Sequence, residues 1–416
     1  MKIKLILAFF IVQLGFAQLR TCGVEQQMQR IMANPQLKQQ YLETQAKFEI
    51  ELQKLQQLQI ANKIGATNLN TVATIKIPVA VHFPDELTPS ACLRSLAQNQ
   101  VNILNADYNA LNSDISQWTT ASTFFPGVSI GSLNVQFVIA NQNHPAGTGL
   151  VNGDLAVTFG TDFLGGADND TTWNGYLNLV CRDAGSGILG YSPLGGSPNN
   201  GATVVIAYSA FGSGSGCSGY VPGAPYNLGR TLTHELGHFF NLNHTFAGCT
   251  TASNCATSGD KVCDTPASNA AVYGCPTVGA TVKCSVKTLT MNYMDYTDDA
   301  CMYMFTAGQA TRMLAYYNAI STQFTTTALK NDDFLETNFS IFPNPNKGEF
   351  NIKLKTAMDD YSIQIYDITG RVIFEKDFIQ NQNLEQSISI NNSLLGVYFV
   401  SIKSNGAILT KKIIVE

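Results

Sequence analysis

The residues with the clearest chemical potential lie between His234 and His244. The chain has five histidines, and three of them fall within this short stretch. His234 and His238 are one helical turn apart, so on a helix both imidazoles project from one face, about 6 Å apart along the axis. That separation lets two ring nitrogens meet one zinc ion at about 2.0–2.1 Å. Glu235, one residue further round, is placed to take a proton from a water that zinc has acidified.

The third histidine, His244, requires this helix to end. It lies six residues beyond His238, and a continuing helix would carry it about 9 Å along the axis. Asn241 lies between them and is the expected terminator, because asparagine is second only to glycine in tolerating the left-handed conformation that ends helices. A turn at Asn241 would bring His244 back to the metal. We therefore predict a zinc site of three histidines, with Glu235 as general base.

This stretch resembles the long zinc-binding signature of metzincin peptidases, in which glycine is more usual at the Asn241 position. Asn241 followed by His244-Thr245-Phe246 resembles the pappalysin branch. The resemblance implies an α/β (α+β) metzincin catalytic domain with a twisted sheet, an active-site helix and a loop-rich C-terminal subdomain. The implied activity is that of a secreted zinc endopeptidase acting on protein or peptide substrates.

Two other interpretations fit the histidines. One is a helix whose histidines are satisfied by hydrogen bonds and bind no metal. The other is a secreted adhesin or binding protein that keeps a structural zinc. Glu235 discriminates against the second, because a purely structural site has no use for a base beside the metal.

A second motif is Met291-Asn292-Tyr293-Met294-Asp295-Tyr296. It resembles the Met-turn of the metzincins, which implies that Met294 packs its polarisable thioether beneath the ligand rings. Tyr296 matches the tyrosine that steadies the tetrahedral intermediate in several metzincins. Asp298 and Asp299 follow where related enzymes carry acid near the S1′ pocket, which implies a preference for a basic residue after the scissile bond.

The segment from Gly185 to Tyr191 resembles the edge strand above the metzincin cleft. An edge strand has open backbone donors and acceptors, so an extended peptide can pair with it. We expect Gly187 and Leu189 to bind substrate in this way. A glycine-rich turn is the alternative.

The loop Gly259-Asp260-Lys261-Val262-Cys263-Asp264-Thr265-Pro266 resembles a calcium-binding segment of the pappalysins. The resemblance implies a carboxylate from Asp260, a carbonyl from Val262 and oxygens from Thr265. Oxygen ligands suit a hard cation. An Asx-type turn explains the same residues without an ion.

Length and composition set the remaining limits. A chain of 416 residues predicts two or three domains, and 45% hydrophobic against 13% charged residues argues against disorder. A net charge of −5 and the lack of a basic patch interleaved with aromatics argue against a nucleic-acid partner. Residues 1–17 predict a signal peptide, with a basic start and an apolar run too short to span a bilayer, and no other segment predicts a transmembrane helix.

Because an exported protein meets an oxidising environment, we expect the ten cysteines to form disulfides. Four thiolates on a second zinc is the rival interpretation, but the spacings lack paired Cys-x-x-Cys knuckles. The family resemblance implies the bridges Cys249–Cys284 and Cys275–Cys301, and proximity suggests Cys255–Cys263. Cys92, Cys181 and Cys217 receive no partner from the sequence.

Residues 18–72 predict a pro-segment, rich in Gln, Lys, Leu and Ala, with a helix from Leu42 to Ile60. Its motif Arg20-Thr21-Cys22-Gly23 resembles the cysteine motif that keeps related zymogens latent. A Cys22 thiolate would fill the coordination position that water needs. The alternative is a disulfide at Cys22, which the even total of cysteines favours.

Residues 73–324 are the expected catalytic domain. Strands are predicted at 75–83, 135–140, 176–181 and 203–208, with an amphipathic helix over 89–112 and a closing helix over 305–317. Thr306 and Gln309 form a capping-box pattern at the start of the closing helix. His82 and His144 are assigned structural and surface positions.

A polar linker (325–338) precedes a region with a different sequence pattern. Short alternating runs separated by turns from residue 339 to 416 predict a small antiparallel sandwich. Phe342-Pro343-Asn344-Pro345 and the terminal Lys411-Lys412-Ile413-Ile414-Val415 resemble the sorting domain of type IX secretion in Bacteroidetes, which implies the secretion machinery as a partner. A carbohydrate-binding or adhesion module is the alternative.

Overall fold

The computed structural model describes residues 21–62, 74–160, 171–185, 187–199 and 204–329, and most of 339–416. The gaps in the last stretch are residues 355–359, 368–370, 380–382, 391–394 and 405–406. The chain divides into two compact units, Met1–Leu329 and Lys330–Glu416, and each is described by itself. The expected signal peptide (1–17) and much of the expected linker (325–338) lie outside the described residues.

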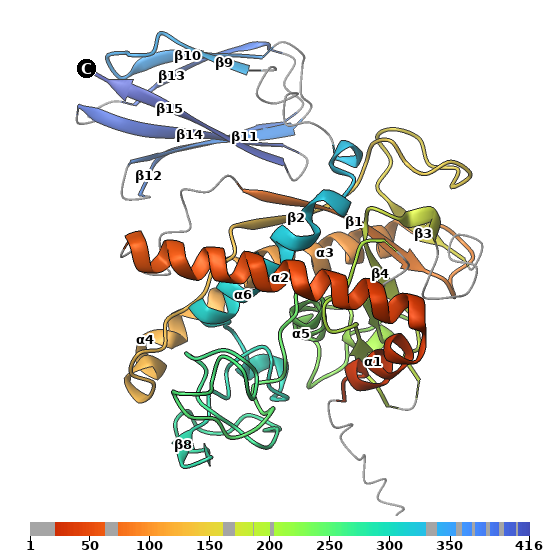
Figure 1. Ribbon diagram of the computed structural model, residues 1–416. Coiled ribbons are helices and arrows are strands. Elements are labelled where there is room, and N and C mark those ends of the chain that lie inside the picture. The colour runs from red at the N-terminus through yellow and green to blue at the C-terminus, as the bar shows by residue number, and fades with distance from the viewer. Residues whose placement is uncertain are drawn as a thin grey trace, which may run out of the picture. The chain divides into compact units, whose positions relative to one another are not determined.

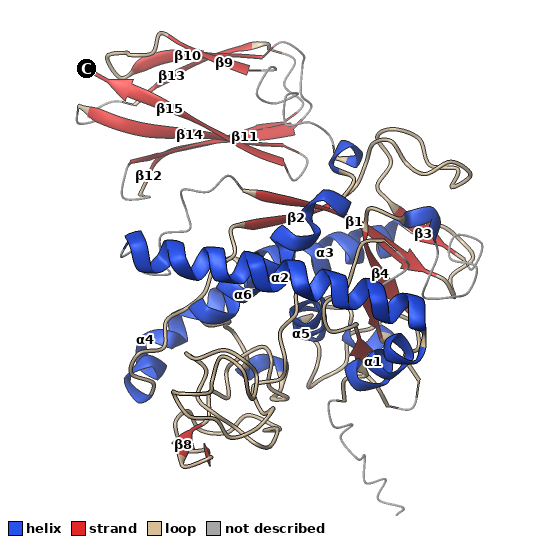
Figure 2. Cartoon of the chain, viewed as in Figure 1, coloured by secondary structure: helices blue, strands red, loops and turns tan. Residues whose placement is uncertain are grey.

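A mixed sheet forms the centre of the first unit (Figures 1 and 2). Its strands are β1 (Ile75–Phe83), β2 (Val135–Ile139), β3 (Val157–Phe159), β4 (Leu177–Cys181), β5 (Gly190–Tyr191) and β6 (Val204–Ile206). The order is β2-β1-β4-β6-β5, with β3 also pairing with β1. All pairings are parallel except that of β5, which runs antiparallel to β6 at the edge. The four strands predicted at 75–83, 135–140, 176–181 and 203–208 are confirmed.

Helices α3 (Ala91–Tyr108) and α5 (Arg230–Phe239) pack on this sheet. Helix α6 (Ala307–Ile320) contributes side chains to the same core. The capping box expected at Thr306 and Gln309 is present and begins α6. The predicted apolar side of α3 is buried against β2 and α5. Because sheet and helices bury their apolar faces together, the first unit has an extensive core, and the predicted α/β class is confirmed.

Short helical segments connect the longer elements. They are α4 (Trp118–Ala121) and the 3₁₀ segments Ser113–Gln117, Ser122–Phe124, Thr171–Trp173, Tyr208–Ala210, Asp299–Cys301, Ser321–Gln323 and Thr326–Ala328.

The expected pro-segment (18–72) contains two helices, α1 (Val24–Ala33) and α2 (Pro35–Asn62). The predicted helix from Leu42 to Ile60 falls within α2, but α2 begins earlier and α1 was not predicted. The side chain of Asn34 accepts hydrogen bonds from the amides of Gln36 (3.0 Å) and Leu37 (3.1 Å), and Pro35 occupies the first helical position. Such a cap and an N-terminal proline start a helix without help from apolar periodicity. Helix α2 packs across α6 (Figure 1).

After α5 the chain becomes loop-rich, with one small hairpin of β7 (Val282–Lys283) and β8 (Val286–Lys287). Disulfides hold these loops, and the three expected pairs, Cys249–Cys284, Cys275–Cys301 and Cys255–Cys263, are present. A fourth, Cys92–Cys217, ties the start of α3 to a loop 125 residues away. Because the six cysteines from 249 to 301 are all bridged, a second zinc held by them is not supported.

The second unit is a sandwich of two antiparallel sheets. The strands are β9 (Phe339–Phe342), β10 (Glu349–Leu354), β11 (Asp360–Asp367), β12 (Val372–Ile379), β13 (Glu385–Ser389), β14 (Gly396–Ser404) and β15 (Ala407–Val415). One sheet has the order β13-β10-β9 and the other β12-β11-β14-β15. Their apolar side chains form one shared core, which confirms the predicted sandwich. Across the part of the chain that the structure describes, no helix is long and apolar enough to cross a membrane.

Candidate metal centre and active site

Helix α5 supplies the first two histidines, and it ends where the sequence predicts. Asn241 adopts the left-handed conformation (φ 69°). The amide of Leu242 donates to the carbonyl of Gly237 (2.9 Å), and that of Asn241 donates to the carbonyl of His238 (2.8 Å). These two bonds are those of a Schellman motif, which reverses the chain after a helix. The reversal carries His244 back beside the helix.

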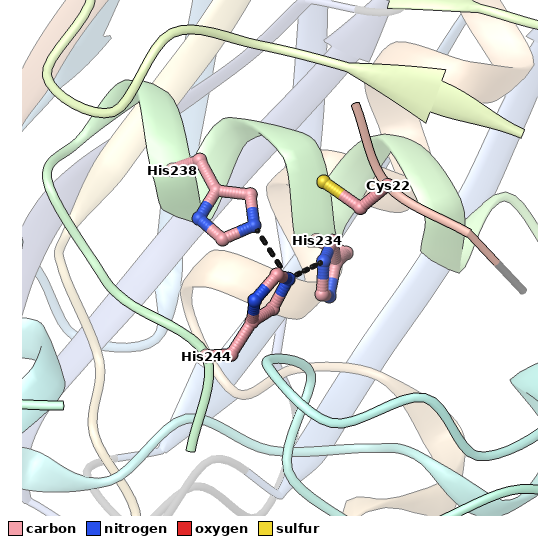
Figure 3. Close-up of side chains that lie close together, drawn as sticks. All are labelled: Cys22, His234, His238 and His244. Carbon is pink, nitrogen blue, oxygen red and sulfur yellow. Dashed lines mark hydrogen bonds between the residues drawn. The ribbon is translucent and has the colours of Figure 1, made fainter. Parts of the chain in front are cut away.

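The three histidines converge on one point, as Figure 3 shows. The Nε2 atom of His244 lies 3.3 Å from Nε2 of His234 and 3.0 Å from Nε2 of His238. Two nitrogens bound to one tetrahedral zinc at about 2.05 Å would lie about 3.3 Å apart. The spacing therefore matches a shared zinc ion.

Hydrogen bonds on the far side of the rings fix which nitrogen faces the centre. His234 Nδ1 lies 2.7 Å from the carbonyl oxygen of Tyr293, and His238 Nδ1 lies 2.7 Å from that of Leu242. A carbonyl accepts only, so each Nδ1 carries the proton and each Nε2 presents a lone pair. Lone pairs that face one another repel, and a cation between them removes the repulsion. The donor set therefore fits a zinc ion.

Burial keeps the imidazoles of His238 and His244 neutral. It lowers the pKa of His238 to about 4 and lowers the pKa of His244 well below its ordinary value, with His238 adding to the second effect. Neutral imidazole is the form that binds a metal, so at neutral pH no proton competes for these positions.

The segment Met291–Tyr296 lies beneath this centre, where a Met-turn is expected. Met294 is fully buried, and a Cβ added at Gly237 would lie 2.3 Å from its sulfur. Gly237 is therefore the position in α5 that makes room for the thioether of Met294. The carbonyl of Met294 accepts from the amide of Thr245 (3.2 Å), which ties the turn to the chain just after His244.

Aromatic rings surround His244. Phe246 stacks on it with ring centroids 4.6 Å apart, and the ring of Tyr296 lies edge-on at 5.0 Å. Tyr273, 42% exposed, lies 5.8 Å from Tyr296 on the outer side. Burial, with contributions from Cys22 and Glu235, raises the pKa of Tyr296, so its hydroxyl keeps its proton at neutral pH.

The fourth group at the centre comes from the expected pro-segment. The sulfur of Cys22 and one nitrogen from each of the three histidines lie within 4.8 Å of one another. The thiol also donates to Oε2 of Glu235 (3.2 Å). Cys22 lies outside all four disulfides, so the alternative of a bridged Cys22 does not hold in this structure.

The backbone around Cys22 occupies the open edge of the sheet. The amide of Leu189 donates to the carbonyl of Thr21 (3.2 Å), and the amide of Gly23 donates to the carbonyl of Gly190 (3.1 Å). The hydroxyl of Thr21 donates to the carbonyl of Gly187 (2.7 Å). The pro-segment thus pairs in parallel with the expected edge segment, of which only Gly190 and Tyr191 form a regular strand.

The loop expected to bind calcium brings three oxygens together. The Thr265 hydroxyl lies 2.5 Å from Oδ2 of Asp260 and 2.7 Å from the carbonyl oxygen of Val262. One hydroxyl proton serves one acceptor, and the other oxygen pair is left face to face. A cation would relieve that contact, so the residues fit a hard ion. Burial raises the pKa of Asp260 to about 7.

One expected substrate residue is placed elsewhere. Asp299 is fully buried, and its Oδ2 accepts from the amides of Leu228 (2.9 Å) and Arg230 (3.2 Å). It therefore caps the start of α5, and the expectation that it faces a substrate is wrong. A carboxylate stabilises a helix N-terminus, and that role was not visible from its position beside Asp298. Asp298 is half-buried, with its amide bonded to Gly274 (3.1 Å), and its role stays a prediction.

Sequence reasoning missed three residues at the centre. They are Phe246, which stacks on His244, Tyr273, which extends the aromatic wall, and Tyr293, whose carbonyl orients His234. A backbone acceptor carries no side-chain signal, so Tyr293 could not have been found. Phe246 lies inside the motif that resembles the family, and an aromatic residue two positions after His244 could have indicated a ring beside that ligand.

Two family models match the chain. Residues 218–318 match the family described as pregnancy-associated plasma protein-A, and residues 340–416 match the secretion system C-terminal sorting domain. An extracellular metalloprotease of Sordaria macrospora is 50% identical over 96 residues, which are 22% of this chain and 31% of the relative. One from Verticillium alfalfae is 43% identical over 151 residues, 34% of this chain and 50% of the relative. The chain thus spans half or less of these two relatives.

Solved structures extend the likeness. Mature mirolysin of Tannerella forsythia in complex with a cleaved peptide is 30% identical, with a TM-score of 0.50, covering 62% of this chain and 97% of that one. A promirolysin variant from the same organism is 27% identical, with a TM-score of 0.53, covering 74% of this chain and 98% of that one.

Proposed function

Because the chain belongs to the pappalysin family of metzincin metallopeptidases, we propose that it is a zinc-dependent endopeptidase made as a latent zymogen. The observation that carries the proposal is the convergence of three neutral imidazole nitrogens beside the carboxylate of Glu235. His234, His238 and His244 would hold the metal. Zinc in such a site acidifies water and polarises a carbonyl.

Glu235 is the proposed general base. Its Oε2 accepts from the Cys22 thiol, so the sulfur marks a position from which a proton can pass to the carboxylate. With the pro-segment withdrawn, a water in that position would donate to the same oxygen. Glu235 takes the proton as the water attacks the scissile carbonyl, and then gives it to the leaving amine nitrogen.

Tyr296 is the proposed partner of the developing oxyanion. Its raised pKa keeps the phenol protonated, and only a protonated phenol donates a hydrogen bond. Its ring lies beside both His234 and His244, at 5.6 and 5.0 Å. A donor aimed at charge that forms in the transition state lowers the barrier for the chemical step.

Substrates are proposed to bind along the edge that the pro-segment now occupies. The amide of Leu189 and the carbonyls of Gly187 and Gly190 already bond to residues 21–23. An extended peptide can use the same groups once these residues leave, since backbone pairing needs no particular side chain. Asp298 is proposed to favour a basic residue after the scissile bond.

Latency is proposed to rest on two anchor points. The first is Cys22, whose sulfur fills the fourth position at the centre. The second is α2, where the side chain of Asn241 donates to Gln45 (3.0 Å). Beside it, Phe48 is fully buried, with the guanidinium of Arg312 4.7 Å from its ring centre. Because α2 is hydrogen-bonded to the turn that positions His244, release of α2 and exposure of the metal centre are proposed to be coupled.

Calcium is proposed as a structural ion held by Asp260, Val262 and Thr265. The neighbouring Asp264 accepts from the hydroxyl of Thr306 (2.7 Å) and the amide of Gly308 (2.7 Å). That pair of bonds joins the calcium loop to the start of α6. The ion would therefore hold the loop in place beside the helix that closes the domain.

The sorting domain determines where this activity is delivered. Residues 340–416 match the domain that directs export by the type IX secretion system, so the protein is extracellular. Secretion machinery is thus the implied partner of the second unit, and proteins or peptides are the proposed substrates of the first.

The decisive experiment compares the wild type with Glu235→Ala on a peptide library, with cleavage read by mass spectrometry. The variant should bind zinc and keep its fold but lose peptidase activity, because only the base is missing. Near wild-type cleavage by fully zinc-loaded Glu235→Ala would rule out the base assignment. Zinc binding without cleavage by the activated wild type would favour the adhesin alternative.

A further inference from the structure

A buried charged cluster lies behind the metal ligands, at the start of α5. We call it the Arg230 cluster, and its members are Asp107, Asp114, Arg230, Thr233 and Tyr293. Nη1 of Arg230 donates to the carboxylate of Asp107 and to the hydroxyl of Tyr293 (2.7 Å). Nη2 donates to both oxygens of Asp114 (3.0 and 3.1 Å). The hydroxyl of Thr233 donates to the second oxygen of Asp107 (2.6 Å).

The cluster joins four separate parts of the first unit. Asp107 belongs to α3, Asp114 to the 3₁₀ segment Ser113–Gln117, Arg230 and Thr233 to α5, and Tyr293 to the Met-turn. Arg230 is only 7% exposed, and Asp107 and Tyr293 are at 2% and 0%. A buried charge that loses its partner is strongly unfavourable, so the cluster tolerates only arrangements in which all members stay paired. It therefore fixes α3, α5 and the Met-turn relative to one another.

Tyr293 links the Arg230 cluster to the metal centre through its two ends. Its hydroxyl is held by Arg230, while its carbonyl accepts from Nδ1 of His234 (2.7 Å). Its amide donates to the carbonyl of Met304 (3.0 Å), and its ring packs 4.8 Å from that of Phe305. Arg230 and His234 are one helical turn apart, so helix, histidine, tyrosine and arginine close a ring of contacts.

We propose that Arg230 and Tyr293 are positioning residues that set the orientation of the His234 imidazole. Neither touches the metal position. Arg230 holds the hydroxyl, the hydroxyl holds the backbone of Tyr293, and the carbonyl of Tyr293 fixes the ring of His234. The inference rests on the proposed role of His234 as a metal ligand. Groups that orient a metal-binding histidine typically contribute about 10–100-fold to metal affinity or activity.

The test uses the activated full-length enzyme and the variant Tyr293→Phe. This change removes one oxygen and keeps the ring, so Arg230 remains paired with both carboxylates. We expect about 10-fold weaker zinc binding by chelator competition and about 10-fold lower kcat, with KM changed less than twofold. The visible spectrum of the cobalt-substituted enzyme should also shift, because one imidazole is reoriented.

Tyr303→Phe is the matched control. Tyr303 is also buried in this subdomain, and within the described part of the chain its hydroxyl has no hydrogen-bond partner. Its loss should leave zinc affinity, kcat and the cobalt spectrum unchanged. If Tyr293→Phe behaves like Tyr303→Phe in all three measurements, the positioning role is refuted.

A second variant keeps the test independent of one substitution. Arg230→Lys retains the charge but not the planar fork that serves several acceptors at once, so it should weaken zinc binding by at least about 10-fold. The double variant with Tyr293→Phe should be no weaker than Arg230→Lys alone, because both changes break one chain of contacts. Additive losses would overturn the inference. If His234→Ala leaves zinc affinity unchanged, the ligand assignment fails instead, and the two failures are distinguishable.

Discussion

Substitution of Asn241 should separate the two tasks that this residue performs. Its backbone takes the left-handed conformation (φ 69°) that brings His244 to the centre, a task that the mature enzyme would also need. Its side chain bonds to Gln45 of the expected pro-segment, at 3.0 and 3.4 Å, a task that belongs to the zymogen alone. Asn241→Ala damages both tasks, whereas Asn241→Gly damages only the second, because glycine adopts the left-handed conformation without strain.

The magnitudes follow from these contacts. A left-handed conformation costs an ordinary residue about 1–2 kcal/mol, and asparagine less. We expect Asn241→Ala to lower the free energy of unfolding of the mature enzyme by about 1 kcal/mol, with zinc affinity about fivefold weaker. Asn241→Gly should stay near the wild type. The two lost hydrogen bonds to Gln45 contribute about 0.5–1.5 kcal/mol each, so both variants should weaken the docking of α2 similarly.

Two assays read these effects separately. Denaturant unfolding and chelator competition on the mature enzyme report the turn, and amide hydrogen exchange along α2 in the zymogen reports docking. Gln45→Ala is the control, since it should speed exchange in α2 and leave the mature enzyme unaffected. If Ala and Gly at position 241 give equal stability and equal zinc affinity, the left-handed turn is not what positions His244.

Three further outcomes are expected. An alkylating agent should label two thiols, Cys22 and Cys181, in the unfolded, unreduced zymogen, and only Cys181 in the mature enzyme. The Cys22→Ala zymogen should show peptidase activity before processing. If Cys22 is not labelled and the variant zymogen is inactive, Cys22 does not keep the zymogen latent. Burial raises the pKa of Asp260 from its ordinary 3.8 to about 7, so the stability of the calcium-free fold falls as pH rises from about 4 to about 7 and then stays level, whereas calcium needs the ionised form. The gain in melting temperature on adding calcium should therefore grow from pH 6 to pH 8, and a gain of equal size at both would count against this site. Gly237→Ala should destabilise the enzyme by about 1–3 kcal/mol, because its Cβ would lie 2.3 Å from the sulfur of Met294. Gly223→Ala is the control, because Gly223 has no positive φ and its added Cβ would meet no atom closer than 3.8 Å; an equal loss in both variants would contradict the steric argument.

Features set by short-range physics could be predicted from the sequence. Helix α5 and its end at Asn241 depend on residues within two turns of each other, as does the capping box of α6. The strands of the sandwich follow from alternation, and the zinc ligands from one spacing. In each case residues close together in the sequence favour one backbone conformation over its few alternatives.

Features set by contacts between distant segments could not be predicted from the sequence. Strand β5 has two residues, and only its pairing with β6 makes it a strand. The bridge Cys92–Cys217 joins positions 125 residues apart, and loop length alone does not choose among possible partners. Asp299 was expected near the substrate because related enzymes carry acid at that place in the motif, whereas its carboxylate accepts hydrogen bonds at the start of α5.

The position of the expected pro-segment depends both on local residue chemistry and on contacts with distant segments. The resemblance of its motif, together with thiol chemistry, indicated that Cys22 suits a zinc centre, but the thiol reaches that centre because Thr21 and Gly23 pair with the edge beside Glu235. Such backbone pairing would accept almost any sequence, so it contributes position and not selectivity. Selectivity for the pro-segment must then come from side chains, which are the sulfur at the metal centre and Gln45 and Phe48 on α2. A peptide substrate has neither, and it can therefore use the same edge and leave after cleavage.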